Sequence, residues 1–366
     1  MNNLIDVDFS LAIHNRTGKY FIGRDLLDSP DLPIGDVYYW WIRGQQPPAR
    51  LFGRIVGRLQ HWHITGRTIG GPLAALPGRR SSRPLLHLDP FTVPTTQLRS
   101  QDAVLCHDIG PVTHPQLFDP DVGRIYAHIY RTCERVGPHL IFVSETSRAA
   151  FIGAFPGANA DKMRVIYPAT RAGIVATLPA PVRGVDGPYL LTVGSVGDRK
   201  NQARCIAAFA ESGLAAQGYR YVICGGREPG FEHVEAATRG VAGVICLSYV
   251  SDAELSWLYG NAAGFVLVSL LEGFGMPVAE AVARDLVPLV SRDSVLHEVA
   301  GDGALLADPL DIPSIAAGMT ALAAMSPTTR ARHLLALKQS TARFDIGRIQ
   351  AAWRSALGEI LARSDQ

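Results

Sequence analysis

The stretch Gly264–Ala281, GFVLVSLLEGFGMPVAEA, decides the fold of this chain. It opens with the apolar run Gly264–Val268, turns at Gly273 and Gly275, and continues into a segment with Pro277 near its start. The glycines let the backbone approach a ligand, and proline suits the first turn of a helix. Free N–H groups at such a helix start can face an anion. The stretch therefore predicts a strand, a turn and a helix that together bind phosphate.

Similar apolar runs recur around this stretch and alternate with segments that are long enough for crossover helices. Runs that are apolar throughout are typical of parallel strands that are buried on both faces. We therefore expect a doubly wound α/β domain in the second half of the chain. Its further strands are expected at Tyr189–Val193, Tyr219–Cys224, Val244–Leu247 and Val287–Val290, and its helices at Asn201–Ser212, Asp252–Tyr259 and Met276–Arg284.

The first half repeats this pattern less clearly, which predicts a second α/β domain and a ligand-binding cleft between the two. Leu178–Pro188 is rich in proline and glycine, as interdomain linkers are. We expect domains at residues 1–182 and 183–345, and a helix over 346–366 that returns to the first domain. First-half strands are expected at Leu4–Val7, Val37–Trp40, Leu85–Leu88, Ala103–His107, His139–Ser144 and Met163–Tyr167, and helices at Gly18–Leu27, Val122–Val136 and Thr146–Phe155.

Composition excludes several classes of protein. The 366 residues are 47% hydrophobic and 19% charged, which is typical of a globular chain and not of a disordered or fibrous one. The net charge of +2 gives no overall field for nucleic acid, so we expect no nucleic-acid partner. The five cysteines form no CxxC pair, and neither a signal peptide nor a long apolar run is evident. We therefore expect a cytoplasmic protein.

The region from Val37 to Leu88 is basic and contains no acidic residue. Aromatic side chains are interleaved with its arginines, at Tyr38, Tyr39, Trp40, Trp41, Phe52 and Trp62. One interpretation is a peripheral membrane surface on the inner face of the cytoplasmic membrane, which binds anionic headgroups or a lipid-linked phosphate. The other is an ordinary solvated face over a normal core. The arginines of this 43–83 region are Arg43, Arg50, Arg54, Arg58, Arg67, Arg79, Arg80 and Arg83.

Two strand ends carry candidate ligand-binding side chains. Glu272 and Glu280 would lie about 12 Å apart in a continuous helix, too far for a glycosidase pair that acts on one bond. Two such carboxylates are better suited to accept hydrogen bonds from hydroxyls at two places on a ligand. After the strand at 189–193, Arg199 and Lys200 follow Gly194 and Ser195, and adjacent cations can neutralise two phosphate charges.

These motifs resemble those of the retaining nucleotide-sugar glycosyltransferases of family 4, which have the GT-B fold. The hallmark of that family is a pair of glutamates separated by seven residues in a stretch like EGFGLPxxEA, and Glu272–Ala281 matches it nearly letter for letter. Further similar segments are GSVGDRKNQ (194–202), LSYVSDAELSWLY (247–259), SVLHEVAGDGALLADPLD (294–311), VLCHDIGPVTHP (104–115) and VSETSR (143–148). Arg16-Thr17-Gly18 is similar to the early glycine loop, although the following Lys19-Tyr20-Phe21 departs from the usual form.

The resemblance implies an enzyme that transfers a hexose, with mannose as one candidate, from a GDP- or UDP-linked sugar. The acceptor would be a saccharide or a lipid-linked oligosaccharide in surface polysaccharide biosynthesis, and no cofactor or metal would be needed. Catalytic residues would be His107, Arg199, Lys200 and Glu272. Donor contacts would come from Gly194, Ser195, Tyr249, Val250, Gly273, Phe274, Gly275, Met276 and Glu280, and acceptor-side or diphosphate contacts from Thr17, Gly18 and Asp108, with Asp108 orienting His107.

Three other interpretations bear on this sequence. A non-catalytic protein that binds a nucleotide sugar on the same fold remains an alternative, because fold does not determine function. A nicotinamide-dependent oxidoreductase would need a GxGxxG loop after the first strand of a domain, and none is present. His61 and His63 could form a metal pair, but no third ligand lies nearby in the sequence.

Overall fold

The computed structural model describes residues 4–14, 18–170 and 177–364. The chain divides into two compact units: residues up to Ala169 with those from Ile346 onward, and Thr170 to Asp345. Leu178–Pro188, expected to be the linker, lies inside the second unit. Val182 and Val185 of this stretch are buried, and the backbone N–H of Ala180 donates to the carbonyl of Ala253 at 3.0 Å. These contacts attach the stretch to the second unit, which its composition could not reveal.

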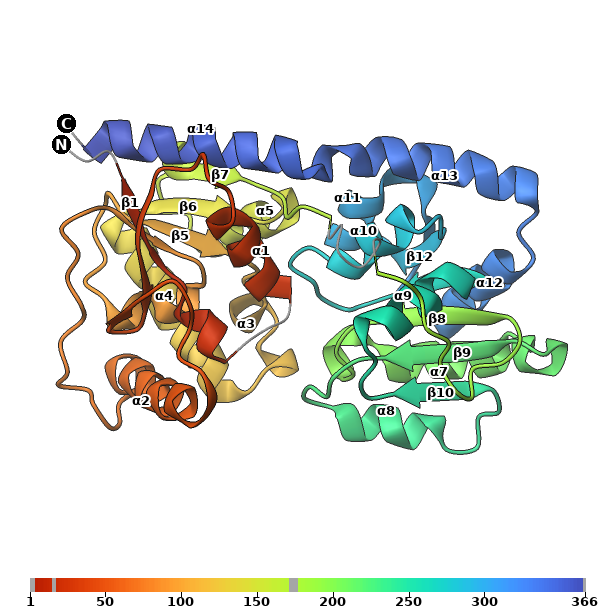
Figure 1. Cartoon of the computed structure of the whole chain (residues 1–366). Coiled ribbons are helices and arrows are strands. Elements are labelled where there is room, and N and C mark those ends of the chain that lie inside the picture. The colour runs from red at the N-terminus through yellow and green to blue at the C-terminus, as the bar shows by residue number, and fades with distance from the viewer. Residues whose placement is uncertain (1–3, 15–17, 171–176, 365–366) are drawn as a thin grey trace. The chain divides into compact units, whose positions relative to one another are not determined.

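The first unit contains a seven-stranded sheet in the order β3-β2-β1-β4-β5-β6-β7 (Figure 1). All neighbouring strands are parallel except β3, which pairs with β2 in the antiparallel sense. The strands are β1 (Ile5–Asp8), β2 (Ile34–Tyr39), β3 (Ile42–Arg43), β4 (Leu85–His87), β5 (Ala103–Cys106), β6 (His139–Phe142) and β7 (Met163–Val165). The helices are α1 (Gly18–Leu27), α2 (Arg50–Ile69), α3 (Gly110–Thr113), α4 (Pro120–Val136), α5 (Glu145–Ala154) and α14 (Ile346–Ser364).

The second unit contains a six-stranded sheet in the order β10-β9-β8-β11-β12-β13, and every neighbouring pair is parallel. Its strands are β8 (Tyr189–Val193), β9 (Arg220–Cys224), β10 (Val244–Leu247), β11 (Gly264–Leu267), β12 (Pro288–Ser291) and β13 (Leu305–Ala307). Its helices are α7 (Gln202–Glu211), α8 (Phe231–Thr238), α9 (Asp252–Asn261), α10 (Met276–Ala283), α11 (Val295–Ala300), α12 (Ile312–Ala323) and α13 (Pro327–Thr341). The α/β class and the parallel sheets predicted from the sequence are confirmed.

Helix α2 was not predicted as a helix. Its glycines lower intrinsic helix propensity, and no side chain caps its start. Tertiary packing explains two of these glycines. A β-carbon at Gly57 would lie 2.2 Å from the ring of His14, and one at Gly66 would lie 2.3 Å from the carbonyl oxygen of Pro72. Close packing of the helix therefore outweighs its weak local preference.

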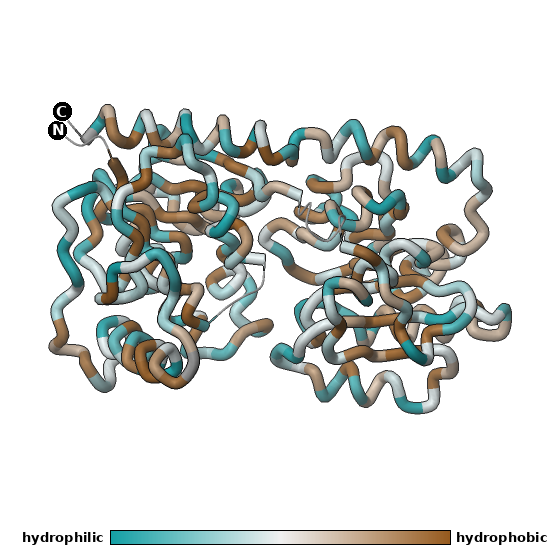
Figure 2. The backbone as a smooth tube through the Cα atoms, viewed as in Figure 1, coloured by the Kyte–Doolittle hydropathy of each residue, from teal (hydrophilic) through white to brown (hydrophobic). Residues whose placement is uncertain are grey.

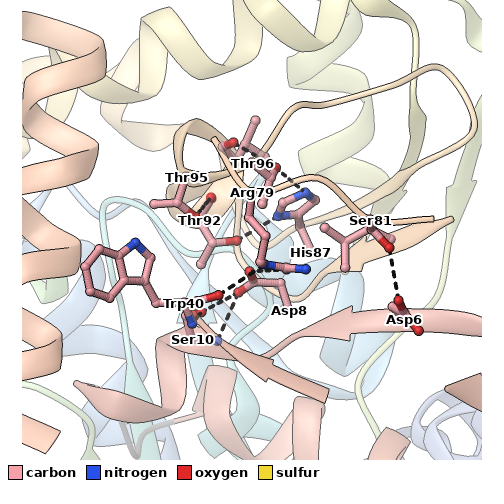
Figure 3. Close-up of polar contacts among 12 residues, drawn as sticks. Asp6, Asp8, Ser10, Trp40, Arg79, Ser81, His87, Thr92, Thr95 and Thr96 are labelled. Carbon is pink, nitrogen blue, oxygen red and sulfur yellow. Dashed lines mark hydrogen bonds and ion pairs between the residues drawn. The ribbon is translucent and has the colours of Figure 1, made fainter. Parts of the chain in front are cut away.

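A buried ion pair lies at the carboxyl end of β1 (Figure 3). Arg79 Nη2 lies 3.4 Å from Asp8 Oδ2, and the Asp8 side chain is fully buried. Burial raises the pKa of Asp8, although Arg79 and the Ser10 hydroxyl act to lower it. The Arg79 guanidinium also stacks 3.7 Å above the centre of the Tyr38 ring. Arg79 therefore links Asp8, at the carboxyl end of β1, to Tyr38 of β2.

The same cluster holds an unusual turn between β2 and β3. Trp40 has a φ of 61°, a conformation that glycine or asparagine usually takes in a two-residue hairpin loop. Its backbone N–H donates to Ser10 Oγ at 2.5 Å, and its carbonyl accepts from Arg79 Nε at 3.1 Å (Figure 3). These contacts offset the backbone strain.

Among the described residues, no helix combines the length and the apolarity needed to cross a bilayer.

Candidate active site

The second sheet reverses its strand order between β8 and β11, and ligands of open α/β sheets bind outside the carboxyl ends of strands at such a point. The two motifs singled out from the sequence follow these two strands. The backbone N–H of Leu270, after β11, donates to the carbonyl of Arg199, after β8, at 2.9 Å. The structure therefore brings the two predicted phosphate-binding segments into direct contact.

The loop after β8 presents Arg199 and Lys200 from a short 3₁₀ turn at Asp198–Lys200. Asn201 ends the turn with a φ of 62°, in the left-handed region. Its side-chain amide donates to the carbonyls of Val268 at 2.9 Å and Pro309 at 2.8 Å. These bonds stabilise the conformation and fix the cation-bearing turn to the end of β11.

Glu272 lies between the two cations. Lys200 Nζ donates to Glu272 Oε1, and Arg199 Nη1 lies 3.3 Å from Glu272 Oε2. The side chains of Lys200 and Glu272 are only 8% and 7% exposed, so water screens their attraction little. Burial acts to raise the pKa of Glu272, but Lys200 and then Arg199 outweigh it and hold this pKa below its ordinary value. Glu272 is therefore ionised at neutral pH.

Glu228 is a second carboxylate at this site and was missed by the sequence analysis. Arg199 Nη2 lies 2.9 Å from Glu228 Oε2, and the Ser195 hydroxyl donates to the same oxygen at 2.5 Å. Within the described parts of the chain, its other oxygen is buried without a hydrogen-bond partner. The signal was the turn Gly225–Gly230, GGREPG, directly after a buried strand.

Glu280 lies on α10 and has a different environment from Glu272. This helix begins after Gly275, whose φ of 92° places it in the left-handed region. The Glu280 side chain is buried, and the Tyr259 hydroxyl donates to its Oε2 at 3.0 Å.

The other donor-side candidates differ in exposure. Phe274 is buried and packs edge-on against Phe344, with ring centroids 5.0 Å apart, so its side chain belongs to the core. Tyr249 is 86% exposed in the loop after β10, and Val250 follows it. Gly194, Gly273 and Met276 lie in or beside the loops that follow β8 and β11.

In the first unit, His107 follows β5 and is buried. Its Nε2 lies 2.8 Å from the carbonyl oxygen of Leu88, which requires a proton on Nε2. Asp108 accepts from the backbone N–H of Gly110 at 3.0 Å. The carbonyl of Leu88, and not Asp108 as expected, therefore orients the His107 ring. Gly18 begins α1, and Thr17 lies outside the described residues.

A partly buried ion pair near His107 was also missed from the sequence. Lys19 Nζ lies 3.0 Å from Asp89 Oδ2, and the Tyr126 hydroxyl donates to Asp89 Oδ1 at 3.3 Å. Burial disfavours the charged form of both groups, but each group stabilises the charged form of the other. The pKa of Lys19 is therefore raised and that of Asp89 is lowered. Asp89 lies two residues after the end of β4, and that position was the available signal.

His61 and His63, the histidine pair without a third ligand nearby in the sequence, both have structural contacts. Trp40 Nε1 donates to His63 Nδ1 at 3.1 Å, and His63 Nε2 donates to the carbonyl of Leu76 at 3.0 Å. His61 stacks on Phe91, with ring centroids 6.2 Å apart. In the portion of the chain that is described, no group of three or more His, Cys, Asp or Glu side chains is arranged to hold a metal ion.

Acid should destabilise the protein through His107. Burial, followed by the positive charge of Lys19, lowers the pKa of His107 to about 4, against 6.5 in an unfolded chain. The native state therefore binds fewer protons than the unfolded state between these values. Stability from this group is complete above pH 6.5 and falls as the pH drops towards 4, by on the order of 3 kcal/mol.

Urea unfolding of the wild type and of His107→Gln at several pH values measures this effect. Glutamine can keep a donor to the Leu88 carbonyl but does not titrate, so its unfolding free energy should fall less steeply below pH 6.5. Parallel curves for the two proteins down to pH 4 would show that His107 is not held neutral.

Comparison with solved structures first defines the fold class. A UDP-forming α,α-trehalose-phosphate synthase from Burkholderia xenovorans superposes with a TM-score of 0.66 at 14% identity and covers 100% of both chains. Anabaena Alr3699/HepE, solved in complex with UDP and glucose, gives a TM-score of 0.59 at 18% identity over 75% of this chain and 77% of that one. The fold is that of the GT-B glycosyltransferases, with two Rossmann-like units.

Sequence comparison then identifies a family similarity. Residues 179–333 match the family described as Glycosyl transferases group 1. O-antigen chain mannosyltransferase B of Escherichia coli is 29% identical over 225 residues, which are 58% of each protein. O-antigen chain mannosyltransferase RfbU of Salmonella typhimurium is 28% identical over 222 residues, 59% of each. The chain thus spans less than two thirds of the length of these relatives.

Proposed function

We propose that this protein is a retaining glycosyltransferase of family 4. It would transfer a hexose, mannose in the first instance, from a nucleotide diphosphate sugar to a saccharide or lipid-linked oligosaccharide in surface polysaccharide biosynthesis. The observation that carries this proposal is the pair of cations, Arg199 and Lys200, held against Glu272 where the second sheet reverses its strand order. The mannosyltransferase names of two relatives support the choice of sugar.

In this proposal, the sugar diphosphate competes with Glu272 and Glu228 for Arg199 and Lys200. The acceptor oxygen attacks the anomeric carbon on the face from which the diphosphate leaves, and the acceptor proton passes to a departing phosphate oxygen. The two cations stabilise the negative charge that grows on that oxygen. Side-chain cations would thus perform the task that a metal ion performs elsewhere, without a cofactor.

The remaining roles follow the family resemblance. Glu272 would bind hydroxyls of the transferred sugar once the diphosphate holds the cations, and Glu280 would bind the ribose. His107, whose Nδ1 carries a lone pair when Nε2 is protonated, can accept a hydrogen bond from a sugar hydroxyl. Backbone groups would contact the donor at Gly194, Ser195, Tyr249, Val250, Gly273, Phe274, Gly275 and Met276. Acceptor-side or diphosphate contacts would come from Thr17, Gly18 and Asp108.

A thermal-shift panel of GDP, UDP, ADP, dTDP and NAD tests donor binding. One nucleoside diphosphate should raise the unfolding temperature and NAD should not. A ligand present at 100 times its Kd, and bound only by the folded state, stabilises by about 2.7 kcal/mol. No shift with any nucleoside diphosphate would contradict the proposed donor site.

Turnover separates an enzyme from a non-catalytic binding protein, the alternative on this fold. Release of GDP or UDP from the matching sugar donor, measured with and without EDTA, tests both the activity and the absence of a metal requirement. NMR of the product's anomeric proton tests retention. Binding without any donor turnover would favour the non-catalytic alternative.

We also propose that the protein works in the cytoplasm, at the inner face of the membrane, through the 43–83 region. Support comes from the outward face of α2, where Leu51, Phe52 and Ile55 are 69%, 59% and 50% exposed beside Arg54 and Arg58. Along this helix the hydropathy alternates sharply, with brown and teal next to each other (Figure 2). Such a face is typical of helices that lie on anionic lipid surfaces.

A further inference from the structure

An open groove of about 950 Å³ runs along α4 on the surface of the first unit. One wall is α4, and the others are the segment around α3 and the carboxyl end of α2. A smaller hollow of about 220 Å³ shares His128, Thr132 and Arg135 with it and adds Arg67 from α2. None of the described candidate active-site residues lines either hollow, whereas Arg67 belongs to the 43–83 region.

The groove is strongly basic. Arg124, His128, Arg131 and Arg135 are spaced three or four residues apart along α4, so they share one helix face. Among the residues that the structure describes, no acidic side chain lines either hollow. Arg124 pairs with Asp121, but no carboxylate in the described parts of the chain pairs with Arg131 or Arg135.

These cations are close enough to repel one another. Burial lowers the pKa of His128, and the charges of Arg135, Arg67 and Arg131 lower it further. Clustered like charges cost stability in water, and a bound anion removes that cost. Guanidinium groups bind phosphate oxygens through two parallel hydrogen bonds, so a phosphate group matches these side chains.

The groove also has apolar lining. Ile69, Pro111, Val112 and Ala127 line it together with the cations. A free inorganic phosphate would gain nothing from this apolar lining, whereas a lipid headgroup brings glycerol and the beginning of its chains.

The groove is continuous with the exposed apolar stripe of α2. Leu51, Ile55, Trp62 and Ile69 recur at helical spacing, so they lie along one line of the helix. The first three are 69%, 50% and 41% exposed, and the fourth lines the groove. A membrane that receives the stripe would therefore also reach the cations of α4.

We propose that the α4 groove seats the phosphate of an anionic membrane lipid while the apolar stripe of α2 enters the headgroup region. This inference rests on the proposed function, because a lipid-linked acceptor would be presented at such a surface. It adds Arg131 and Arg135, which lie outside the 43–83 region, to the membrane-binding residues.

Vesicle sedimentation tests the proposal. The full chain is mixed with vesicles of phosphatidylglycerol and phosphatidylcholine, or of phosphatidylcholine alone, at about 25 mM and 200 mM salt. The wild type should sediment with the anionic vesicles at low salt only. The variant Arg131→Gln/Arg135→Gln should bind them roughly 30-fold more weakly, since two charges near the surface are lost.

A matched control removes the same charge elsewhere. Arg239→Gln/Arg332→Gln changes two exposed arginines of the second unit and should bind anionic vesicles like the wild type. Leu51→Ser/Ile55→Ser, which keeps every charge, should also lose vesicle binding. Equal losses of vesicle binding in the groove variant and the control variant would indicate unspecific charge attraction and overturn the proposal. The proposal would also be overturned if the groove variant bound anionic vesicles as strongly as the wild type.

Two further measurements separate the possible failures. In one outcome, inorganic phosphate raises the unfolding temperature, this effect depends on Arg131, and the protein does not bind vesicles. That outcome would indicate a soluble ligand and overturn the lipid assignment. Nucleotide-dependent thermal shifts and donor turnover are measured on the same preparations without vesicles. If these persist while the wild type ignores anionic vesicles, the inference fails and the glycosyltransferase proposal stands.

Discussion

The double variant Arg199→Ala/Lys200→Ala should lose hexose transfer by a factor of at least about 10³, because each donor to a developing oxyanion contributes about 10² to 10³ in rate. Donor turnover under saturating substrate measures the loss. In this variant, neither cation of the pair remains to stabilise the leaving diphosphate. Turnover within tenfold of the wild type, in a folded variant, would remove both residues from the proposed mechanism.

The structure adds a consequence for stability. Glu272, whose side chain is 7% exposed, would remain buried without its two cations. Removing one side of a buried pair typically costs about 3 to 5 kcal/mol because the remaining charge is uncompensated. A loss of activity alone could therefore reflect unfolding.

The triple variant Arg199→Ala/Lys200→Ala/Glu272→Gln, compared with Glu272→Gln alone, separates these causes. It removes the uncompensated carboxylate and should recover part of the lost unfolding free energy, while transfer stays absent. If the triple variant regained both stability and transfer, the cations would have only a structural role.

Arg79→Met should lower the free energy of unfolding by about 3 to 5 kcal/mol, the range for breaking a buried ion pair. The variant loses the pair with Asp8, the hydrogen bond to the Trp40 carbonyl and the stacking on Tyr38. The Asp8 carboxylate would stay buried without a counter-charge. Equilibrium unfolding in urea, followed by circular dichroism, measures the change.

Two matched variants control this experiment. Arg80→Met alters the neighbouring arginine, which is exposed and bonds to Gln97, and should change stability by less than about 0.5 kcal/mol. Asp8→Asn/Arg79→Met removes both charges and should be more stable than Arg79→Met alone. A single Arg79 variant as stable as the Arg80 variant would contradict the structural role of the pair.

Sequence patterns predicted five of the six strands of the second unit, because these are short, apolar and separated by helix-length segments. Strand β13 and helices α8, α11, α12 and α13 were not predicted. The predicted strands of the first half are also present, but α2 was missed. It contains glycines at 57 and 66, which lower helix propensity, and the packing against His14 and Pro72 explains them. Local propensity cannot report such contacts, since they join residues that are distant in the chain or lie in an adjoining loop.

Site prediction from sequence had a similar limit. Arg199, Lys200, Glu272 and Glu280 stood out through a motif that follows a strand. Glu228 and Asp89 also follow strands, but each is a single acidic residue whose partner lies far away in the sequence. Their ion pairs with Arg199 and Lys19 arise only when parallel strands bring their carboxyl ends to one edge of a sheet.

The Trp40 turn also bears on how the first unit folds. Short hairpins usually form early, because their loop closes locally and a glycine-containing turn costs little. The β2–β3 hairpin lacks that local preference, and its turn is held by Ser10 and Arg79, which come from before and well after it in the chain. We therefore do not expect it to act as a folding nucleus. The edge of the sheet should be completed late, after the segment bearing Arg79 has docked on β1.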